Sequence, residues 1–502
     1  MASYSVLGVA FCISLGVTRG FTDDILSIPK DLLLGTASAA YQIEGAWNEG
    51  GKGESVWDKW THEHPENIID GSNGDVACDS YHKYKEDVQL LKTMGVDFYR
   101  FSLSWTRILP NGFANVINQE GLNYYKNLID ELRANDIEPF VTLYHWDHPE
   151  ILERMGGWTN EMMVDWFTDY AKVVFKELGP KVKYFMTLNE AHIVCNEGYA
   201  TKQKAPGKEL GDVGRFLCLH NMLKAHAKTY HMYDTQFRPQ QKGQIGLVNA
   251  CSGAFAKYPN DTTAVNLHFQ FTCGWLAHPI FSTTGDYPEV MKRHIAENSK
   301  LRGFSKSLLP EFSEAWVQFI QGTSDFFGIN HYTSKLVETM PHTDGKEWYS
   351  FSGVKESVDP SWPGSASNWL KVVPEGFRQI LNKVSEEYNY PPIFVMENGF
   401  SYKCCVTDDR LRISYYHSYL KAMLAAVKLD GCKVKAYATW SVLDNFEWKN
   451  GYKERFGLIN IDFTDPNRTR TPKLSMSWYA NVIKTRKLLP ISNSSDVIVI
   501  AV

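Results

Sequence analysis

Eight short apolar runs recur along the chain, and segments with helical patterns separate them. Two of these segments, 84–94 and 121–135, repeat apolar residues at the spacing of one helix face. Strands that alternate with helices indicate βα units with a parallel sheet, and eight strands suffice to close a barrel. The pattern therefore predicts an α/β fold, a single (β/α)8 TIM barrel with elaborated βα loops. The predicted strands are 32–37, 97–102, 139–144, 183–188, 244–248, 326–329, 393–396 and 436–441.

The 502 residues contain no Gly/Ser-rich or Pro-rich linker, repeat or low-complexity run. Length alone would suggest about three domains, but barrels of this type often run long as single domains. We predict one barrel domain at 21–490, preceded by a signal peptide at 1–20 and followed by a C-terminal tail at 491–502. The apolar run 497–502 in this tail is too short for a membrane span or a lipid-anchor signal.

The N-terminal segment indicates secretion. Residues 6–17 are apolar apart from small polar residues, and Thr18-Arg19-Gly20 offers a cleavage point, although the positively charged start of a signal peptide is missing. The run of roughly 12 residues is too short to span a bilayer, which needs about 20. A buried first strand or helix is the alternative, and the acidic pair Asp23-Asp24 directly after the run disfavours it. We therefore expect a secreted, extracellular protein.

Possible covalent modifications agree with that expectation. Asn260, Asn467 and Asn493 each begin an Asn-x-Ser/Thr glycosylation sequence. The nine cysteines include Cys12 in the predicted leader, and the remaining eight are an even number that permits disulfides. No Cys or His spacing suggests a metal site, so we expect neither a metal nor a cofactor.

The composition restricts the partners of the protein. A net charge of −5 gives no sign of binding to nucleic acid or to a membrane surface. Aromatic residues make up 14% of the chain, with 15 Trp. Such an excess suits a carbohydrate site, where rings cover the apolar faces of sugars, but composition alone favours a large aromatic core.

Polar and aromatic residues gather directly after the predicted strands. In a (β/α)8 barrel the active site lies at this C-terminal face. The residues are Gln42 and Glu44, Arg100 and Trp105, His145-Trp146-Asp147, Asn189-Glu190, Asn330-His331-Tyr332, Glu397-Asn398-Gly399, Trp440, and Glu447-Trp448.

Two glutamates, Glu190 and Glu397, each follow an apolar strand and stand beside an Asn. Their strands lie across the barrel mouth from each other, so both carboxyl groups can point into one pocket. Hydrolysis of a glycosidic bond needs such a pair, one group to protonate the leaving oxygen and one to stabilise or attack the anomeric carbon. A separation of about 5 Å makes the enzyme retaining, and about 6.5–9.5 Å makes it inverting. One Glu alone would most simply be a solvated charge, as most of the 57 acidic residues are.

Seven motifs extend the pattern: AAYQIEG at 39–45, FYRFSLSW at 98–105, HWD at 145–147, TLNE at 187–190, GDYP at 285–288, MENG at 396–399 and WSVLDNFEW at 440–448. With them the chain resembles glycoside hydrolase family 1, the β-glucosidase and lactase-like family that also includes insect myrosinases, from about residue 28 to residue 488. The resemblance implies a retaining β-glycosidase, most simply a β-glucosidase, in which Glu190 is the acid/base and Glu397 the nucleophile. Arg100 and Asn330 would support the nucleophile. The sugar would be bound by Gln42, His145, Asn189, Tyr332, Trp440, Glu447 and Trp448.

The implied roles lead to expectations about charge. Arg100 should lower the pKa of Glu397 and keep this carboxyl ionised. Glu190 faces that anion, so its pKa should be raised and it should begin protonated. Once the glycosyl-enzyme has formed, the charge on Glu397 is gone, and Glu190 can ionise and act as base toward water.

Three positions depart from the pattern of the family. Ala191 stands where Pro usually follows the acid/base, and Glu375 stands where many relatives carry Trp, although insect relatives, including sulfur-glucoside hydrolases, often share this Glu. His148 follows the HWD motif in place of Leu, and we expect it to contact the leaving group at the entrance or to face solvent.

Several functions share these residues. A thioglucosidase (myrosinase) or a transglycosylase would use the same site, whereas a non-catalytic klotho-like binding domain would lack a catalytic Glu. The sequence leaves open whether the protein is a monomer or a homodimer and how glucosides compare with galactosides and fucosides. The partner is a small glycoside whose aglycone (cyanogenic, phenolic or sulfur-linked, or the second sugar of cellobiose) is also open, because variable loops contact it.

Overall fold

The computed structural model describes residues 26–403 and 407–489. The predicted signal peptide at 1–20 lies outside the described residues, as does the tail at 491–502 with the acceptor Asn493. The other two glycosylation acceptors, Asn260 and Asn467, are both exposed.

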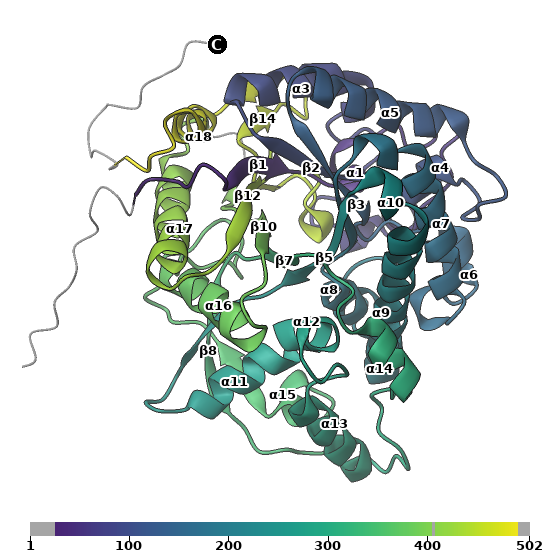
Figure 1. Cartoon of the computed structure of the whole chain (residues 1–502), viewed down its shortest axis with the longest axis vertical. Helices are drawn as coiled ribbons and strands as arrows, with labels where there is room; N and C mark the ends of the chain where they lie inside the picture. Colours follow the sequence, from purple (N-terminus) through teal and green to yellow (C-terminus); the bar gives the residue numbers. More distant parts are fainter. Residues whose placement is uncertain (1–25, 404–406, 490–502) are drawn as a thin grey trace, which may run out of the picture.

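Eight parallel strands close into a barrel at the centre of the molecule (Figure 1), which confirms the predicted fold class. Each predicted run forms one strand, and the observed ends lie within two residues of the predicted ones. In order around the barrel, the strands are β1 (Leu33–Ala37), β12 (Val434–Trp440), β10 (Ile393–Glu397), β7 (Phe327–Asn330), β5 (Gln244–Ala250), β4 (Tyr184–Asn189), β3 (Glu138–Tyr144) and β2 (Phe98–Ser102).

Stacked aromatic rings fill the barrel at the N-terminal ends of its strands. The ring of Phe140 lies 4.1 Å from that of Phe98 and 4.3 Å from that of Tyr184, and Phe326 stacks on Phe394 at 4.2 Å between ring centroids. This packing makes the barrel interior a solid core. The residues singled out after the strands lie at the opposite, C-terminal end.

Helices surround the barrel on the outside (Figure 1). The two helices predicted from periodicity are present as α3 (Ser80–Met94) and α5 (Gln119–Ala134). Val88 and Leu91 on α3 are fully buried, as is Leu132 on α5, because the apolar stripe of each helix faces the core. The other long helices are α7 (Met163–Glu177), α9 (Gly211–Gln236), α13 (Glu289–Leu301), α16 (Pro374–Glu387), α17 (Arg410–Leu429) and α18 (Leu474–Thr485).

The βα loops after β5 and β7 carry a small second sheet, so these loops are elaborated as predicted. It consists of β6 (Gly253–Ala256), β8 (Ser334–Thr339) and β9 (Val354–Ser357). In the lower part of Figure 1, the helix α11 (Thr262–Phe271) lies beside β8, and the helix α15 (Trp348–Ser352) lies beside α13. These insertions build one wall of the space above the barrel.

Two disulfides hold loops at the C-terminal end of the barrel. Cys195, in the π-helical turn η4 (Cys195–Ala200), is bonded to Cys218 on α9. Cys251 follows β5 and is bonded to Cys273, the first residue of α12 (Cys273–Phe281). Both bridges lie beside segments that line the cavity described below. Among the described residues, Cys78 and Cys432 are buried free thiols.

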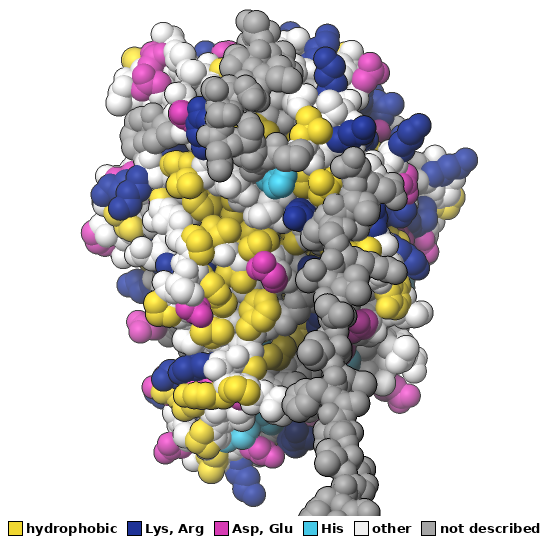
Figure 2. Space-filling view, turned by 90° about the vertical axis from the view of Figure 1, so that its left-hand side faces the viewer, with side chains coloured by type: hydrophobic (Ala, Val, Ile, Leu, Met, Phe, Trp, Pro, Cys, Tyr) yellow, Lys and Arg dark blue, Asp and Glu magenta, His cyan; other side chains and the backbone are white. Residues whose placement is uncertain are grey.

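Apolar side chains gather along the middle of the face that Figure 2 shows, with charged groups mostly at its margins. Exposed apolar areas of this kind can be contact surfaces. No helix in the described ranges is long and apolar enough to cross a membrane.

Candidate active site

A cavity of about 890 Å³ opens at the C-terminal ends of the barrel strands. Nine of the residues singled out from the sequence line it together: His145, Trp146, Glu190, Asn330, Tyr332, Glu397, Trp440, Glu447 and Trp448. Gln42, Arg100 and Asn189 lie directly behind these residues and are fully buried. The structure thus brings every predicted catalytic and sugar-binding residue to one place.

Glu397 is the last residue of β10 and is held by two donors. Arg100 Nη1 donates to Oε1 over 2.6 Å, and the Tyr332 hydroxyl donates to Oε2 over 2.7 Å. Arg100 is itself fixed, because Nη2 donates to Asn189 Oδ1 at 2.6 Å and Nε donates to Thr142 Oγ1 at 3.0 Å. The carboxylate therefore has one defined orientation toward the cavity.

The net pKa of Glu397 differs from the expectation. Burial raises this pKa, and the charge of Arg100 and the hydrogen bonds from Tyr332 and Arg100 lower it without cancelling the effect of burial. Arg100 lowers the pKa of Glu397 as expected, but burial has the larger effect, so the net pKa is raised. The reason is that a carboxyl group with only 4% residue exposure loses most of its hydration, which favours the neutral form.

Glu190 lies between β4 and the short helix α8 (Ala191–Val194) and has a left-handed backbone with φ of 47°. Its Oε1 accepts a hydrogen bond of 2.8 Å from Asn330 Nδ2. Burial and then the negative charge of Glu397 raise the pKa of Glu190 to about 8, which agrees with the expected direction. Ala191, which stands where relatives usually carry Pro, begins α8 as the first helical residue.

The two carboxyl groups have unlike neighbours. Glu397 accepts a hydrogen bond from a guanidinium group, whereas Glu190 accepts one from the neutral amide of Asn330. When the pair holds one proton, the negative charge is therefore most stable on Glu397 and the proton on Glu190. Asn330 Nδ2 also donates to Asn189 Oδ1 at 3.1 Å, so the amide that contacts Glu190 is tied to the residue that holds Arg100.

Polar groups on the β1 side of the cavity are fixed but incompletely bonded. Gln42 Nε2 donates to Asn445 Oδ1 at 3.0 Å and to the carbonyl oxygen of Phe446 at 2.8 Å. Gln42 Oε1 and His145 Nδ1 are buried and have no hydrogen-bond partner in the part of the chain that the structure describes. Buried polar atoms without partners are rare, and hydroxyl groups of a ligand would satisfy both.

Glu447 and the indole rings complete this end of the cavity. Burial, followed by the charge of Glu454, raises the pKa of Glu447 to about 8. The ring of Trp448 lies 4.6 Å from that of Trp146 and 5.9 Å from the imidazole of His145. The aromatic surface beside polar groups is the arrangement that a sugar, with apolar faces and a polar rim, requires.

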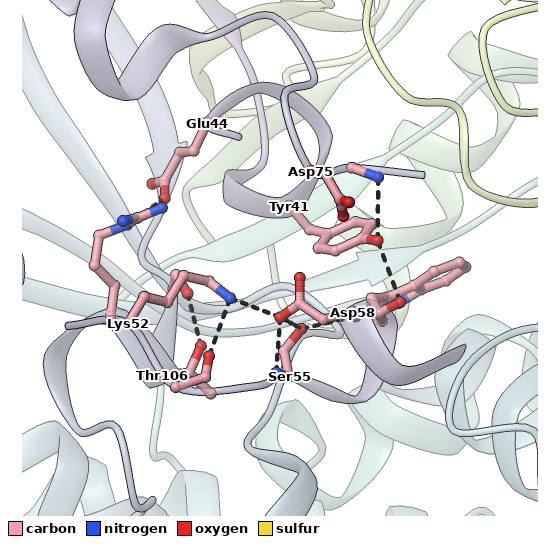
Figure 3. A network of polar contacts seen from close by, with 12 residues as sticks. Tyr41, Glu44, Lys52, Ser55, Asp58, Asp75 and Thr106 are labelled. Carbon is pink, nitrogen blue, oxygen red and sulfur yellow. Dashed lines mark hydrogen bonds and ion pairs between the residues drawn. The ribbon is translucent and has the colours of Figure 1, made fainter. Parts of the chain in front are cut away.

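A buried polar network holds the segment that carries Gln42 (Figure 3). Glu44, two residues further on, accepts hydrogen bonds from Arg107 Nε at 2.9 Å and from the Tyr125 hydroxyl at 2.7 Å. Below it, Lys52 Nζ lies 2.6 Å from Asp58 Oδ2. Because each charge here is paired, the network fixes the backbone around Gln42.

Many residues that line the cavity were not found from the sequence, among them Lys204 and Trp369. Lys204 lies with Nζ 3.0 Å from Glu197 Oε2 and 4.3 Å from the centre of the Trp146 ring. Trp369 is 42% exposed and packs edge-on against Tyr332. Neither belongs to one of the quoted motifs, so no local signal pointed to them.

The expectation for His148 is wrong. This side chain is fully buried, with Nε2 2.9 Å from Glu153 Oε2 and Nδ1 3.1 Å from the Tyr144 hydroxyl. It does not line the cavity, because its imidazole pairs with an acidic residue of the helix α6 (Glu150–Arg154) in the interior.

Glu375 is exposed in the first turn of α16. Across the described ranges, no group of three or more His, Cys, Asp or Glu could hold a metal ion.

The fold and the buried carboxyl pair define a barrel enzyme that hydrolyses glycosides. The family model for glycosyl hydrolase family 1 matches residues 26–488, and the chain belongs to this family. The chain is 44% identical to Myrosinase 1 of Brevicoryne brassicae, with 91% of this chain and 99% of that protein covered. It is 42% identical to Beta-glucosidase 12 of Oryza sativa subsp. indica, with 90% and 92% covered. A solved structure of aphid myrosinase superposes with a TM-score of 0.88 at 42% identity, covering 92% of this chain and all of that one.

Proposed function

We propose that the protein is a secreted retaining β-glucosidase, which removes the terminal non-reducing β-D-glucosyl residue of small glucosides through a covalent glycosyl-enzyme. The single observation that carries this proposal is the unequal surroundings of the two glutamates: the cation Arg100 donates to Glu397, and the neutral amide of Asn330 donates to Glu190. Relatives that are named β-glucosidases support the choice of the sugar.

In the first step, Glu397 attacks the anomeric carbon, and Glu190 gives its proton to the leaving oxygen. A bond forms between Glu397 and the sugar as the bond to the aglycone breaks. Arg100 and Tyr332 orient Glu397 so that one oxygen lies toward the sugar. The proton is available because the pKa of Glu190 is raised to about 8.

In the second step, the ester of Glu397 carries no charge, so of the two causes that raise the pKa of Glu190, burial and then the charge of Glu397, the second is removed. Glu190, which lost its proton in the first step, is the carboxylate that takes a proton from water as the water attacks the anomeric carbon. Glu397 leaves as a carboxylate and returns to its contacts with Arg100 and Tyr332. Two inversions at the same carbon give the product the β configuration of the substrate.

The Glu397→Gln variant tests this function. An amide is a very poor nucleophile, so we expect no measurable turnover of an aryl β-glucoside by a variant that unfolds at the same temperature as the wild type. For the wild type, NMR of the first-formed sugar should show the β anomer. Near wild-type activity of the variant, or α-glucose as the first product, would contradict the assignment.

A second candidate is hydrolysis of sulfur-linked glucosides. The 44% identity to Myrosinase 1 of Brevicoryne brassicae favours it. The same two glutamates would act, but a thiolate leaving group depends less on the acid. Comparison of kcat/KM for matched aryl O-glucosides and S-glucosides decides between the two.

Secretion is supported by the disulfides Cys195–Cys218 and Cys251–Cys273. Such bonds persist mainly in oxidising compartments. The exposed acceptors Asn260 and Asn467 are also accessible to glycosylation.

A further inference from the structure

The cavity is larger than a glucosyl residue needs. Its volume of about 890 Å³ lies near the top of the range of roughly 300–1,000 Å³ that is typical of sites for drug-sized ligands. The groups proposed for the sugar come mainly from the β1 and β12 side, with Gln42 and Glu447. The remaining space is therefore available to the aglycone.

The barrel order locates that remaining space. Counted around the barrel from β1, the strand β5 is the fourth neighbour in either direction and so lies opposite β1. Ser252 follows β5 and lines the cavity there, beside the Cys251–Cys273 disulfide. The same wall includes the aromatic residues Phe271, Trp348 and Tyr349 beside polar and charged ones such as Lys335 and Lys355.

One chain of polar groups crosses this wall. Ser252 Oγ lies 2.9 Å from His268 Nε2, and His268 Nδ1 lies 3.2 Å from Glu356 Oε1. The three residues come from different elements, the segment after β5, helix α11 and strand β9. His268 is 1% exposed, whereas Ser252 and Glu356 line the cavity.

The tautomer of His268 decides whether Ser252 offers a ligand an acceptor or a donor. A proton on Nδ1 faces the carboxylate of Glu356 3.2 Å away, although Nδ1 makes no hydrogen bond within the described residues. Nε2 is then free to accept the hydroxyl proton of Ser252, and the lone pairs of Ser252 Oγ accept from a ligand. If Nε2 is also protonated, Ser252 donates instead. A hydroxyl group on the ligand is satisfied in both cases.

We propose that Ser252, supported by His268 and Glu356, is an anchor for the aglycone, and that the preferred substrates are glucosides of extended aromatic aglycones that carry a hydroxyl group far from the glycosidic bond. The aromatic residues of this wall contact the ring faces, and the anchor binds the distal hydroxyl. This inference rests on the proposed β-glucosidase function and names the substrate class of the same site.

A matched pair of substrates tests the anchor. Biphenyl-4-yl β-glucoside and its 4′-hydroxy derivative differ by one distal hydroxyl, so their leaving groups are nearly equal. One neutral hydrogen bond corresponds to roughly a three- to tenfold effect, and we expect the wild type to prefer the hydroxylated substrate by this factor in kcat/KM. Ser252→Ala should bring the ratio to about one, and Ser252→Thr, which keeps a hydroxyl, should restore it.

Thr272→Val is the control. Thr272 lines the same cavity, but its hydroxyl already donates to the carbonyl oxygen of His268 at 2.7 Å, so this variant should keep the wild-type ratio. A role of Ser252 in folding alone would change stability and leave the ratio unchanged. A wild-type ratio near one, or an unchanged ratio in Ser252→Ala, overturns the anchor. Failure of the wild type to cleave p-nitrophenyl β-glucoside would instead contradict the proposed function.

Discussion

At the residue scale, the cavity holds two glutamates whose chemistry is set by their neighbours. Glu397 receives hydrogen bonds from Arg100 and Tyr332, and Glu190 receives one from Asn330. Both side chains are buried, so burial raises the pKa of each, and the contact with a cation is what distinguishes them. Changes to single neighbours should therefore alter acid–base behaviour more than binding.

Glu190→Ala should reduce activity according to the leaving group. An acid matters most for a poor leaving group, and general acid–base help is typically worth about 10²–10⁴-fold. Alkyl glucosides and cellobiose should lose more activity than activated aryl glucosides, for which the glycosyl-enzyme should accumulate. Azide, which needs no base, should restore turnover and yield a β-glycosyl azide. Equal losses for all leaving groups without azide rescue would exclude Glu190 as the acid/base.

Tyr332→Phe should move the acid limb of the pH profile. The Tyr332 hydroxyl, whose own pKa burial raises well above its usual value, stays protonated and stabilises ionised Glu397. Its loss raises the pKa of Glu397, so the nucleophile ionises only at higher pH. Because a hydrogen bond to a charged group is worth about 1.5–3 kcal/mol, the acid limb of kcat/KM should shift upward by about one to two pH units. A profile identical to that of the wild type would contradict this role.

At the element scale, loops that line the cavity are fastened to the helices around the barrel. The disulfide Cys195–Cys218 joins the turn η4 to α9, and η4 contributes Asn196 and Glu197 to the cavity wall. The bridge therefore restrains the segment that directly follows Glu190 and α8. The same bridge therefore contributes to the stability of the protein and to the shape of the cavity.

Removal of this bridge by Cys195→Ala with Cys218→Ala should destabilise the protein. The bridged residues are 23 apart in sequence, and a loop of this size corresponds to about 3 kcal/mol. Chemical unfolding under non-reducing conditions measures the loss. Cys432→Ser, which changes a buried thiol outside any bridge among the described residues, is the control and should cost less. Equal stability of the double variant and the wild type would show that the bridge contributes nothing.

At the scale of the whole molecule, one barrel carries the site, and its aromatic core closes the end opposite to the cavity. The loops after β5 and β7 extend this barrel by the sheet β6–β8–β9, which forms the wall assigned to the aglycone. The barrel thus presents the two glutamates, and the added wall shapes the space for the leaving group.

The proposed secretion also concerns the whole molecule. Protein from a eukaryotic host should begin near Phe21 and carry glycans on some of Asn260, Asn467 and Asn493. N-terminal sequencing and mass determination before and after glycan removal measure both features. An intact Met1 on folded protein without glycans would contradict secretion.

The sequence by itself determined the eight strands and the positions of Glu190 and Glu397 at their ends. Both depend on short-range information. An apolar run of strand length and the polar residues directly after it can be recognised from a stretch of a few consecutive residues. The resemblance to glycosyl hydrolase family 1, later confirmed, depended on the same local motifs.

Only the tertiary structure decided the properties that depend on distance and burial. Arg100 and Glu397 are 297 residues apart in sequence and 2.6 Å apart in space, and the raised pKa of Glu397 reflects how completely the barrel buries it. The inward turn of His148 and the contact between Ser252 and His268 arise in the same way. Electrostatic and hydrogen-bond energies depend on the separation of atoms and on exclusion of water, and neither quantity is encoded in any local stretch of sequence.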